Sequence, residues 1–175
     1  MTIYTIGHST RTIDEFIDLL KQHAIEVLVD IRSFPMSRRL PHFNRENMEK
    51  SLAEAQIEYR WMKDLGGRRR RILQDSPNIA LRNDAFRNYA DYMLTAPFRG
   101  AIEELLQLAA KKRTAYMCAE AVYFRCHRML VSDYLTAHGH HVRHILDKNE
   151  PRLHTLMADA RIIDGQLLYR GDRLL

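Results

Sequence analysis

The chain has 175 residues, of which 46% are hydrophobic and 28% are charged, and its formal net charge is +5. This length suits one sizeable core, so we expect a single domain over residues 1–175, and no run reaches the roughly 20 apolar residues that a membrane span needs. The first residues lack the basic segment of a signal peptide, and two cysteines are too few for a disulfide scaffold. These features predict a cytoplasmic protein with free thiols, and the positive charge favours an anionic small molecule or nucleic acid as a partner.

The N-terminal third of the chain predicts two parallel strands joined by a helix. Residues 3–6 form a short apolar run rich in β-branched side chains, which is typical of a buried strand. Thr12 and Glu15 have the spacing of a capping box for a helix that ends near His23. Residues 26–31 form a second apolar run. A strand, a helix and a strand within about 30 residues make a βαβ unit, in which the two strands are parallel.

The middle of the chain predicts a helix, a third strand and a long loop. The expected elements are a polar loop, a helix capped by Asn44 and a strand, over residues 32–43, 45–55 and 58–62. Gly66 and Gly67 then break the strand before four consecutive arginines, Arg68–Arg71. Because the residues up to 83 show little periodicity, we interpret this segment as an exposed loop.

The second half of the chain predicts three helices, two strands and a hairpin. In chain order these are helices over 86–94 and 98–110 on either side of Pro97, a strand over 114–118, a helix over 126–137 closed by Gly139, a strand over 141–146, and a hairpin over 162–169 that turns at Asp164 and Gly165. The whole order predicts an α/β fold, with a mainly parallel sheet of about five strands flanked by helices and a small C-terminal hairpin.

Reactive and charged side chains follow four of the predicted strands. They are, strand by strand, His8 and Ser9; Asp30, Arg32 and Ser33; Gly66, Gly67 and Arg68; and Cys118, Glu120, Cys126, His127 and Arg128. In an open parallel sheet, ligands bind where loops leave the carboxyl ends of the strands. We therefore expect these residues to converge on one pocket.

The Cys126-His127-Arg128 run lies where a helix is predicted to begin. Backbone N–H groups and the helix dipole favour an anion at that position and lower the pKa of a thiol. The thiolate of Cys126 can then act as a nucleophile, with His127 moving a proton and Arg128 holding a carboxylate or phosphate. The alternative is that Cys118 and Cys126 only pack against each other in the core, since free cysteine is among the most buried residue types.

Two other patterns indicate different kinds of site. The Arg68–Arg71 run has the charge to bind a nucleic-acid backbone, with the aromatic side chains of Phe43, Tyr59 and Trp61 available to stack on bases. The alternative is a solvated basic loop. A zinc site is the third alternative, with Cys118, Cys126 and His127 as ligands and His8 or His42 as the fourth. The spacing of the two cysteines is unlike that of zinc motifs.

Several of these segments together resemble a known family. They are Thr5–Ser9, Val29–Pro35, Pro41–Phe43, Leu65–Gly67, Met117–Glu120 and Cys126–Arg128. Over nearly the whole chain this pattern is similar to the family called domain of unknown function 488. The resemblance implies an α/β fold and a shared site at these residues, without a substrate. Similar proteins usually have a proline and charged residues before the second cysteine, whereas Val122–Phe124 is apolar here, so this loop is expected to pack differently or to bind a more apolar group.

We favour an enzyme of the transferase or hydrolase type that needs no cofactor, with Cys126 or Cys118 as the reactive thiol. In this hypothesis the proton-exchanging groups are His8, Glu120 and His127, and the anion-binding groups are Arg32 and Arg128. A binding module needs cations and aromatic rings, but it does not need Cys, His, Glu and Asp at successive strand ends. Non-catalytic binding of nucleic acid or nucleotides through Arg68–Arg71, and a metal-dependent protein, remain the alternatives.

Overall fold

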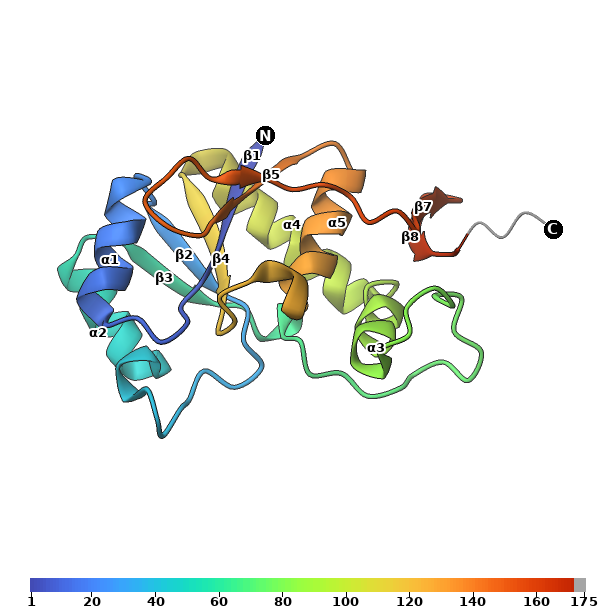
Figure 1. The fold of residues 1–175 in the computed structure, drawn as a ribbon, viewed down its shortest axis with the longest axis horizontal. Coiled ribbons are helices and arrows are strands. Elements are labelled where there is room, and N and C mark those ends of the chain that lie inside the picture. The colour runs from blue at the N-terminus through green and yellow to red at the C-terminus, as the bar shows by residue number, and fades with distance from the viewer. Residues whose placement is uncertain (172–175) are drawn as a thin grey trace.

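The computed structural model describes residues 1–171, in which helices pack on both faces of a six-stranded sheet (Figure 1). The strands are β1 Thr2–Gly7, β2 Val27–Asp30, β3 Glu58–Trp61, β4 Thr114–Cys118, β5 His141–Ile145, β6 Arg152–Leu153, β7 Ala160–Ile163 and β8 Gln166–Tyr169. The α-helices are α1 Ile13–Gln22, α2 Arg45–Glu54, α3 Asp84–Tyr92, α4 Ala96–Lys111 and α5 Arg128–Ala137, and the short 3₁₀ helices are η1 Pro41–Phe43, η2 Lys63–Leu65 and η3 Tyr123–Arg125.

The order of the strands confirms the predicted α/β fold with a mainly parallel sheet. The sheet runs β3-β2-β4-β1-β5-β6, and all its neighbours are parallel except the pair β5–β6. Strands β7 and β8 form a separate antiparallel hairpin. Its turn falls at Asp164 and Gly165, as predicted, and both residues have the positive φ values, 51° and 77°, that a tight hairpin turn of this type requires.

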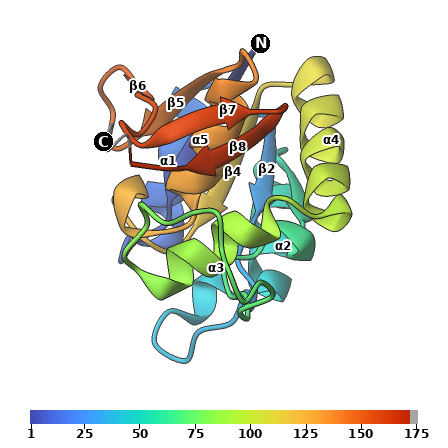
Figure 2. The same cartoon turned by 90° about the vertical axis from the view of Figure 1, so that its right-hand side faces the viewer.

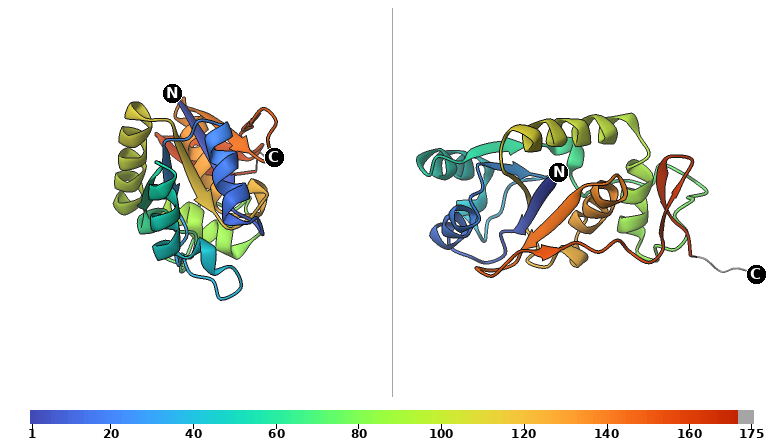
Figure 3. Two further views of the ribbon diagram at one scale, coloured as in Figure 1. Left: turned by 90° about the vertical axis from the view of Figure 1, so that its left-hand side faces the viewer. Right: turned by 90° about the horizontal axis from the view of Figure 1, so that it is seen from above.

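Side chains alternate between two cores, one on each face of the sheet. In β1, Ile3 joins the core beneath α3, α4 and α5, whereas Tyr4 and Ile6 join the core beneath α1 and α2. Figure 3 shows the sheet between these two groups of helices. The hairpin packs on the side of α3, α4 and α5, where Figure 2 shows it lying across α5. A sheet covered on both faces explains why its central strands β1, β2 and β4 are buried almost along their whole length and are mostly apolar.

The predicted helices and strands end within two residues of the observed ones, and the remaining differences have local causes. Helix α1 is capped as expected, because Thr12 Oγ1 accepts a hydrogen bond from the Glu15 N–H at 3.1 Å. Helix α5 begins at Arg128 and not at Cys126, because η3 precedes it and leaves Cys126 extended with φ −141°. Pro97 lies inside the first turn of α4, where its missing N–H breaks no helical bond. Strand β6 was not predicted.

The register of the strands brings four carboxyl ends to one edge of the sheet. Gly7 of β1 lies beside Cys118 of β4, and Asp30 of β2 lies between Met117 of β4 and Trp61 of β3. The convergence of strand ends that the sequence predicts is therefore correct. Within residues 1–171, no helix is long and apolar enough to cross a membrane.

Candidate functional site

The loops at this edge border a cleft with a volume of about 390 Å³. Many of the residues expected from the sequence line it, namely Arg32, Ser33, Gly67, Arg68, Cys118, Glu120, Cys126 and His127. Phe34, Met36 and Ala119 also line it, and the sequence reasoning missed them. Phe34 is 63% exposed, so one wall of the cleft is an apolar surface open to solvent.

The two cysteines meet at the bottom of this cleft. Cys118 is the last residue of β4 and Cys126 follows η3, and their Sγ atoms are 2.8 Å apart. Both are free thiols and both are buried. A disulfide bond is about 2.05 Å long, so the contact between these sulfurs is a hydrogen bond that one thiol donates to the other sulfur.

Arg128 lies against both sulfurs and is completely buried. Its Nε is 3.0 Å from Cys118 Sγ, and its backbone N is 3.4 Å from Cys126 Sγ. The remaining guanidinium nitrogens donate to Thr5 Oγ1 at 2.7 Å and to the Glu120 carbonyl at 2.5 Å. Among the described residues, no carboxylate forms an ion pair with Arg128. A buried guanidinium stays protonated and needs a counter-charge, and the sulfur pair is the group in place to carry it.

The pKa values of the two cysteines are shifted in opposite directions. Burial raises the pKa of Cys118, and the hydrogen bond and charge of Cys126 raise it further. Burial also acts to raise the pKa of Cys126, but hydrogen bonds with Cys118 and His127 and the charge of Arg128 outweigh burial and hold that pKa well below its ordinary value. Of the two forms of the pair that hold one proton, these shifts favour the form with the proton on Cys118 and the thiolate on Cys126.

His127 has a fixed orientation beside the thiolate. Its Nε2 lies 2.9 Å from the Ile31 carbonyl, which can only accept a hydrogen bond, so Nε2 carries a proton. This leaves Nδ1 to take up or release a second proton. A Cβ on Gly67 would lie 2.4 Å from Nδ1, so only glycine allows the loop to approach this ring so closely.

A buried ion pair supports the cleft from behind. Arg32 Nη2 lies 2.6 Å from Asp30 Oδ2, and the hydroxyl of Tyr59 donates to the same oxygen at 2.5 Å. His8 is stacked on Phe43, with ring centroids 4.1 Å apart, and its Nε2 faces Arg32 Nη1 at 3.4 Å. Burial is the main cause that lowers the pKa of His8 to about 4. The contacts with Asp30 and His8 thus fix the position of Arg32, and neither of these two residues lines the cleft.

Other expected residues form the backbone frame of the site. A Cβ on Gly7 would lie 1.6 Å from the Glu120 carbonyl oxygen, and one on Gly66 would lie 2.5 Å from Ser33 Oγ. Ser33 Oγ also accepts the N–H of Arg68 at 2.9 Å. Ser9 has φ 53°, and its N–H donates to the Ala119 carbonyl at 2.9 Å. These contacts hold together the loops that follow β1, β2, η2 and β4. The side chain of Glu120 is exposed at the rim of the cleft.

The arginine run is less uniform than its sequence suggests. Arg69 stacks over the ring of Tyr92 at 3.7 Å and donates to the Gly66 and Lys63 carbonyls. Arg71 donates to backbone carbonyls of its own loop. Arg68 is exposed, lines the cleft and has its guanidinium 5.4 Å from the Phe34 ring. Of the rings expected to stack on bases, Phe43 is buried, Tyr59 is bound to Asp30, and Trp61 lies under Arg45.

The proposed zinc ligands do not form a set. Among residues 1–171, no three His, Cys, Asp or Glu side chains are arranged to hold a metal ion. His42 bonds the Arg11 carbonyl through Nε2 at 2.9 Å, and His8 faces Arg32.

A buried hydrogen-bond network that the sequence reasoning missed continues from Arg128 toward the C-terminal segment. Thr5 Oγ1, which accepts from Arg128, is 3.3 Å from His144 Nδ1, and His144 Nε2 is 2.8 Å from His154 Nδ1. His154 Nε2 is in turn 2.7 Å from Asp133 Oδ1. The ring of Tyr123 stacks on His144 with centroids 3.5 Å apart, which anchors η3 to the same network.

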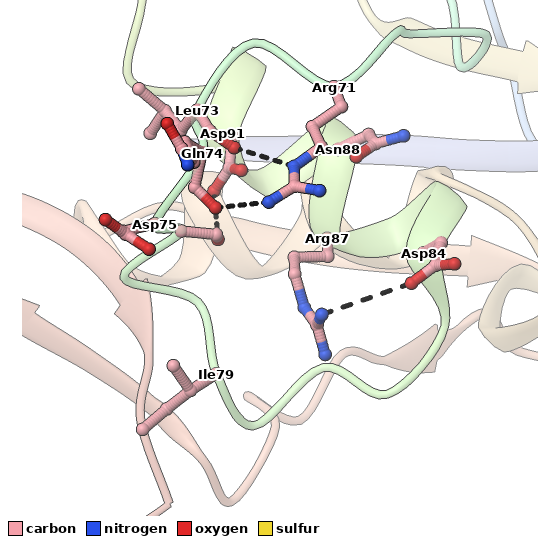
Figure 4. A pocket seen from close by; sticks show the side chains of 10 residues that line it. Arg71, Leu73, Gln74, Asp75, Ile79, Asp84, Arg87, Asn88 and Asp91 are labelled. Carbon is pink, nitrogen blue, oxygen red and sulfur yellow. Dashed lines mark hydrogen bonds and ion pairs between the residues drawn. The ribbon is translucent and has the colours of Figure 1, made fainter.

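A larger cavity lies elsewhere, between α3 and the loop that follows the arginine run (Figure 4). Its volume is about 580 Å³, and its lining is polar. The charged groups in it mainly hold the loop together, since Asp91 accepts from Ser76 and Asn78, and Arg71 donates to Leu73 and Gln74. It contains no thiol or imidazole. The smaller cleft is therefore the better candidate for chemistry.

The comparisons with known proteins identify a family without an activity. A family model described as domain of unknown function DUF488 matches residues 12–135, which is more than half of the chain. The matched range contains both cysteines and Arg128, whereas Gly7, His8 and Ser9 lie before it. No curated protein and no solved structure matches the chain.

Proposed function

The chain belongs to the DUF488 family, whose description gives no activity, and from the geometry of the cleft we propose that it is a thiol-dependent enzyme of the transferase or hydrolase type. Cys126 is the nucleophile, and the substrate is an anion with an electrophilic centre. One observation carries the proposal: a fully buried Arg128, which forms no ion pair with a carboxylate of residues 1–171, lies against two sulfurs 2.8 Å apart at the bottom of an open cleft. Such a charge favours a thiolate, which is the reactive form of cysteine.

The other groups of the cleft take roles that follow from their free atoms. His127 Nδ1 exchanges a proton with the substrate or the leaving group, because Nε2 is occupied by the Ile31 carbonyl. Arg68 binds the anionic part of the substrate, since the guanidinium groups of Arg32 and Arg128 are already bonded to protein acceptors. The reducing cytoplasm that the sequence predicts keeps both cysteines as thiols.

Alkylation by a charged and a neutral reagent tests this proposal. We expect iodoacetate to modify Cys126 near neutral pH, and the ratio of its rate to that of iodoacetamide to exceed the ratio for free cysteine, because the exposed guanidinium of Arg68 lines the cleft. Cys126→Ser should abolish the fast reaction. Arg68→Ala should lower the rate ratio by roughly threefold or more, whereas Arg82→Ala, which removes an exposed arginine outside the cleft, should not. Two unreactive thiols in the folded protein would refute the proposal.

Nucleic-acid binding is a second candidate, supported by the contact between Arg68 and the exposed ring of Phe34. A cation next to an exposed aromatic ring suits a phosphate and its stacked base. Labelled single-stranded DNA and RNA should then bind with a steep dependence on salt, which Arg68→Ala flattens, in a fluorescence anisotropy titration. The absence of binding at low salt would remove this candidate.

A further inference from the structure

The thiol of Cys118 has no role in the proposed reaction of Cys126. A hydrolase or an acyl transferase needs one thiolate, whereas this site holds a second sulfur that is buried with the first and lies 2.8 Å from it. Arg128 contacts both, through Nε to Cys118 Sγ and through its backbone N–H to Cys126 Sγ. A second thiol so close can attack any bond that the first forms to an external sulfur atom.

We propose that the site carries out thiol–disulfide exchange with small disulfides of anionic thiols. This inference rests on the proposed function, because it takes Cys126 as the nucleophile, and it adds the class of substrate and a role for Cys118 as the resolving thiol. The exposed guanidinium of Arg68 lines the cleft and selects the anionic disulfide. The apolar ring of Phe34 lies beside this guanidinium.

The reaction balances in two exchange steps. The Cys126 thiolate attacks one sulfur of R–S–S–R, a Cys126–S–S–R bond forms, and RS⁻ leaves. Cys118 then gives its proton to His127 or water and attacks Cys126 Sγ, which forms the Cys118–Cys126 disulfide and releases the second RS⁻. Two electrons pass from the two protein sulfurs to the substrate, which ends as two thiols. The reverse sequence, with a small thiol as the reductant, restores the thiol–thiolate pair.

The buried charge of Arg128 drives the transfer from one sulfur to the other. When Cys126 enters the mixed disulfide, it loses its negative charge, and Cys118 Sγ, 3.0 Å from Nε, becomes the sulfur able to neutralise the guanidinium. Loss of the Cys118 proton is then favoured at the step that needs it. When the internal disulfide forms, neither sulfur is charged and Arg128 is left without a counter-charge. The internal disulfide is therefore easily reduced, since the reduced form gains an ion pair that the oxidised form lacks.

Glutathione disulfide, which is an anion, and cystamine, which is a cation, are suitable probes for the reduced full-length protein. With excess glutathione disulfide, wild type should lose two hydrogen atoms by intact mass, carry no glutathione, and release two equivalents of glutathione. Cys118→Ser and Cys118→Ala should each stop with one glutathione on Cys126. Arg68→Ala should slow the reaction with glutathione disulfide by roughly threefold or more without slowing the reaction with cystamine, and Arg82→Ala should change neither.

The exchange proposal would be overturned if wild-type protein accumulated bound glutathione, as we expect only of the Cys118 variants. This result is obtained with wild type alone, so it does not depend on whether a variant folds. Alkylation of Cys126 in the same preparation separates the two proposals. Fast alkylation without an internal disulfide refutes exchange and leaves the nucleophile in place, whereas an unreactive Cys126 refutes both. An internal disulfide that a glutathione buffer does not reduce would also contradict the role given to Arg128.

Discussion

Asp133 of helix α5 offers the sharpest test of how the C-terminal segment is held to the site. Its carboxylate is completely buried and accepts three hydrogen bonds, from His154 Nε2 at 2.7 Å, Tyr169 Oη at 2.9 Å and the Met157 N–H at 3.1 Å. All three donors come from residues that follow β5. Asp133→Ala removes both acceptor oxygens at once and leaves these donors without a partner in the interior.

The expected loss of stability is large. A buried donor without a partner costs about 1–3 kcal/mol, and part of this is recovered when the loop at Met157 relaxes toward water. We therefore expect Asp133→Ala to lower the free energy of unfolding by about 3–6 kcal/mol, out of a total of about 5–15 kcal/mol for a typical domain. Tyr169→Phe removes one of the three donors and its bond, and should cost about 1 kcal/mol.

Urea denaturation followed by circular dichroism measures both losses. Asp18→Ala is the matched control, because Asp18 is exposed in the middle of α1 and its removal should change the free energy of unfolding by less than about 0.5 kcal/mol. If Asp133→Ala costs less than about 1 kcal/mol, or no more than Tyr169→Phe, then this carboxylate is not what holds the segment in place.

Three further predictions concern the cleft and its supports. Gly67→Ala places a Cβ 2.4 Å from His127 Nδ1, so the ring or the loop must move, and alkylation of Cys126 should slow by about tenfold. The alkylation rate of wild type should hold as the pH falls from about 8.5 and decline only as the pH passes through the lowered pKa of Cys126, whereas in Arg128→Met the decline should begin at higher pH. Folding stability should decrease as the pH falls from 6.5 toward about 4, because burial lowers the pKa of His8 and the unfolded chain binds the proton first. The difference between the pKa of His8 in the unfolded chain, 6.5, and in the folded protein, about 4, corresponds to about 3 kcal/mol of folding stability at most. Denaturant titrations at several pH values measure this loss, and the free energy of unfolding of His8→Asn should change less with pH than that of wild type.

The fold was predictable where a pattern is local and continuous. Strand β4 and the hairpin turn at Asp164 and Gly165 were placed correctly, because an apolar run and a turn dipeptide are each complete within a few residues. Strand β6 has only two residues, both exposed, so it has no periodicity to detect, and it exists because it pairs with β5. The start of α5 was predicted two residues early, since the 3₁₀ turn at 123–125 gives no separate signal in the sequence.

The sequence predicted where the cleft lies, but not how its side chains are oriented. Parallel strands bring their carboxyl ends together, so the sequence order alone grouped Arg32, Gly67 and the two cysteines. It could not show that Arg128 turns inward to the sulfurs, because the direction of a long side chain is set by packing. Nor could it connect His144 with His154, which lie on different segments and meet only in the folded chain.

The bonds around Arg128 explain why this position requires a guanidinium. Arg128 donates in three directions at once, to a sulfur, to Thr5 Oγ1 and to the Glu120 carbonyl, and a lysine ammonium cannot match this planar geometry. Because Thr5 Oγ1 accepts from Arg128, its own hydroxyl proton can be donated to His144 Nδ1. His144 Nε2 then donates to His154 Nδ1, and His154 Nε2 donates to Asp133 Oδ1. Every link between Arg128 and Asp133 then has a donor and an acceptor, so the network orients the guanidinium without placing a carboxylate in contact with it. The positive charge of Arg128 is therefore neutralised by the two sulfurs, and this favours the thiolate on which their reactivity depends.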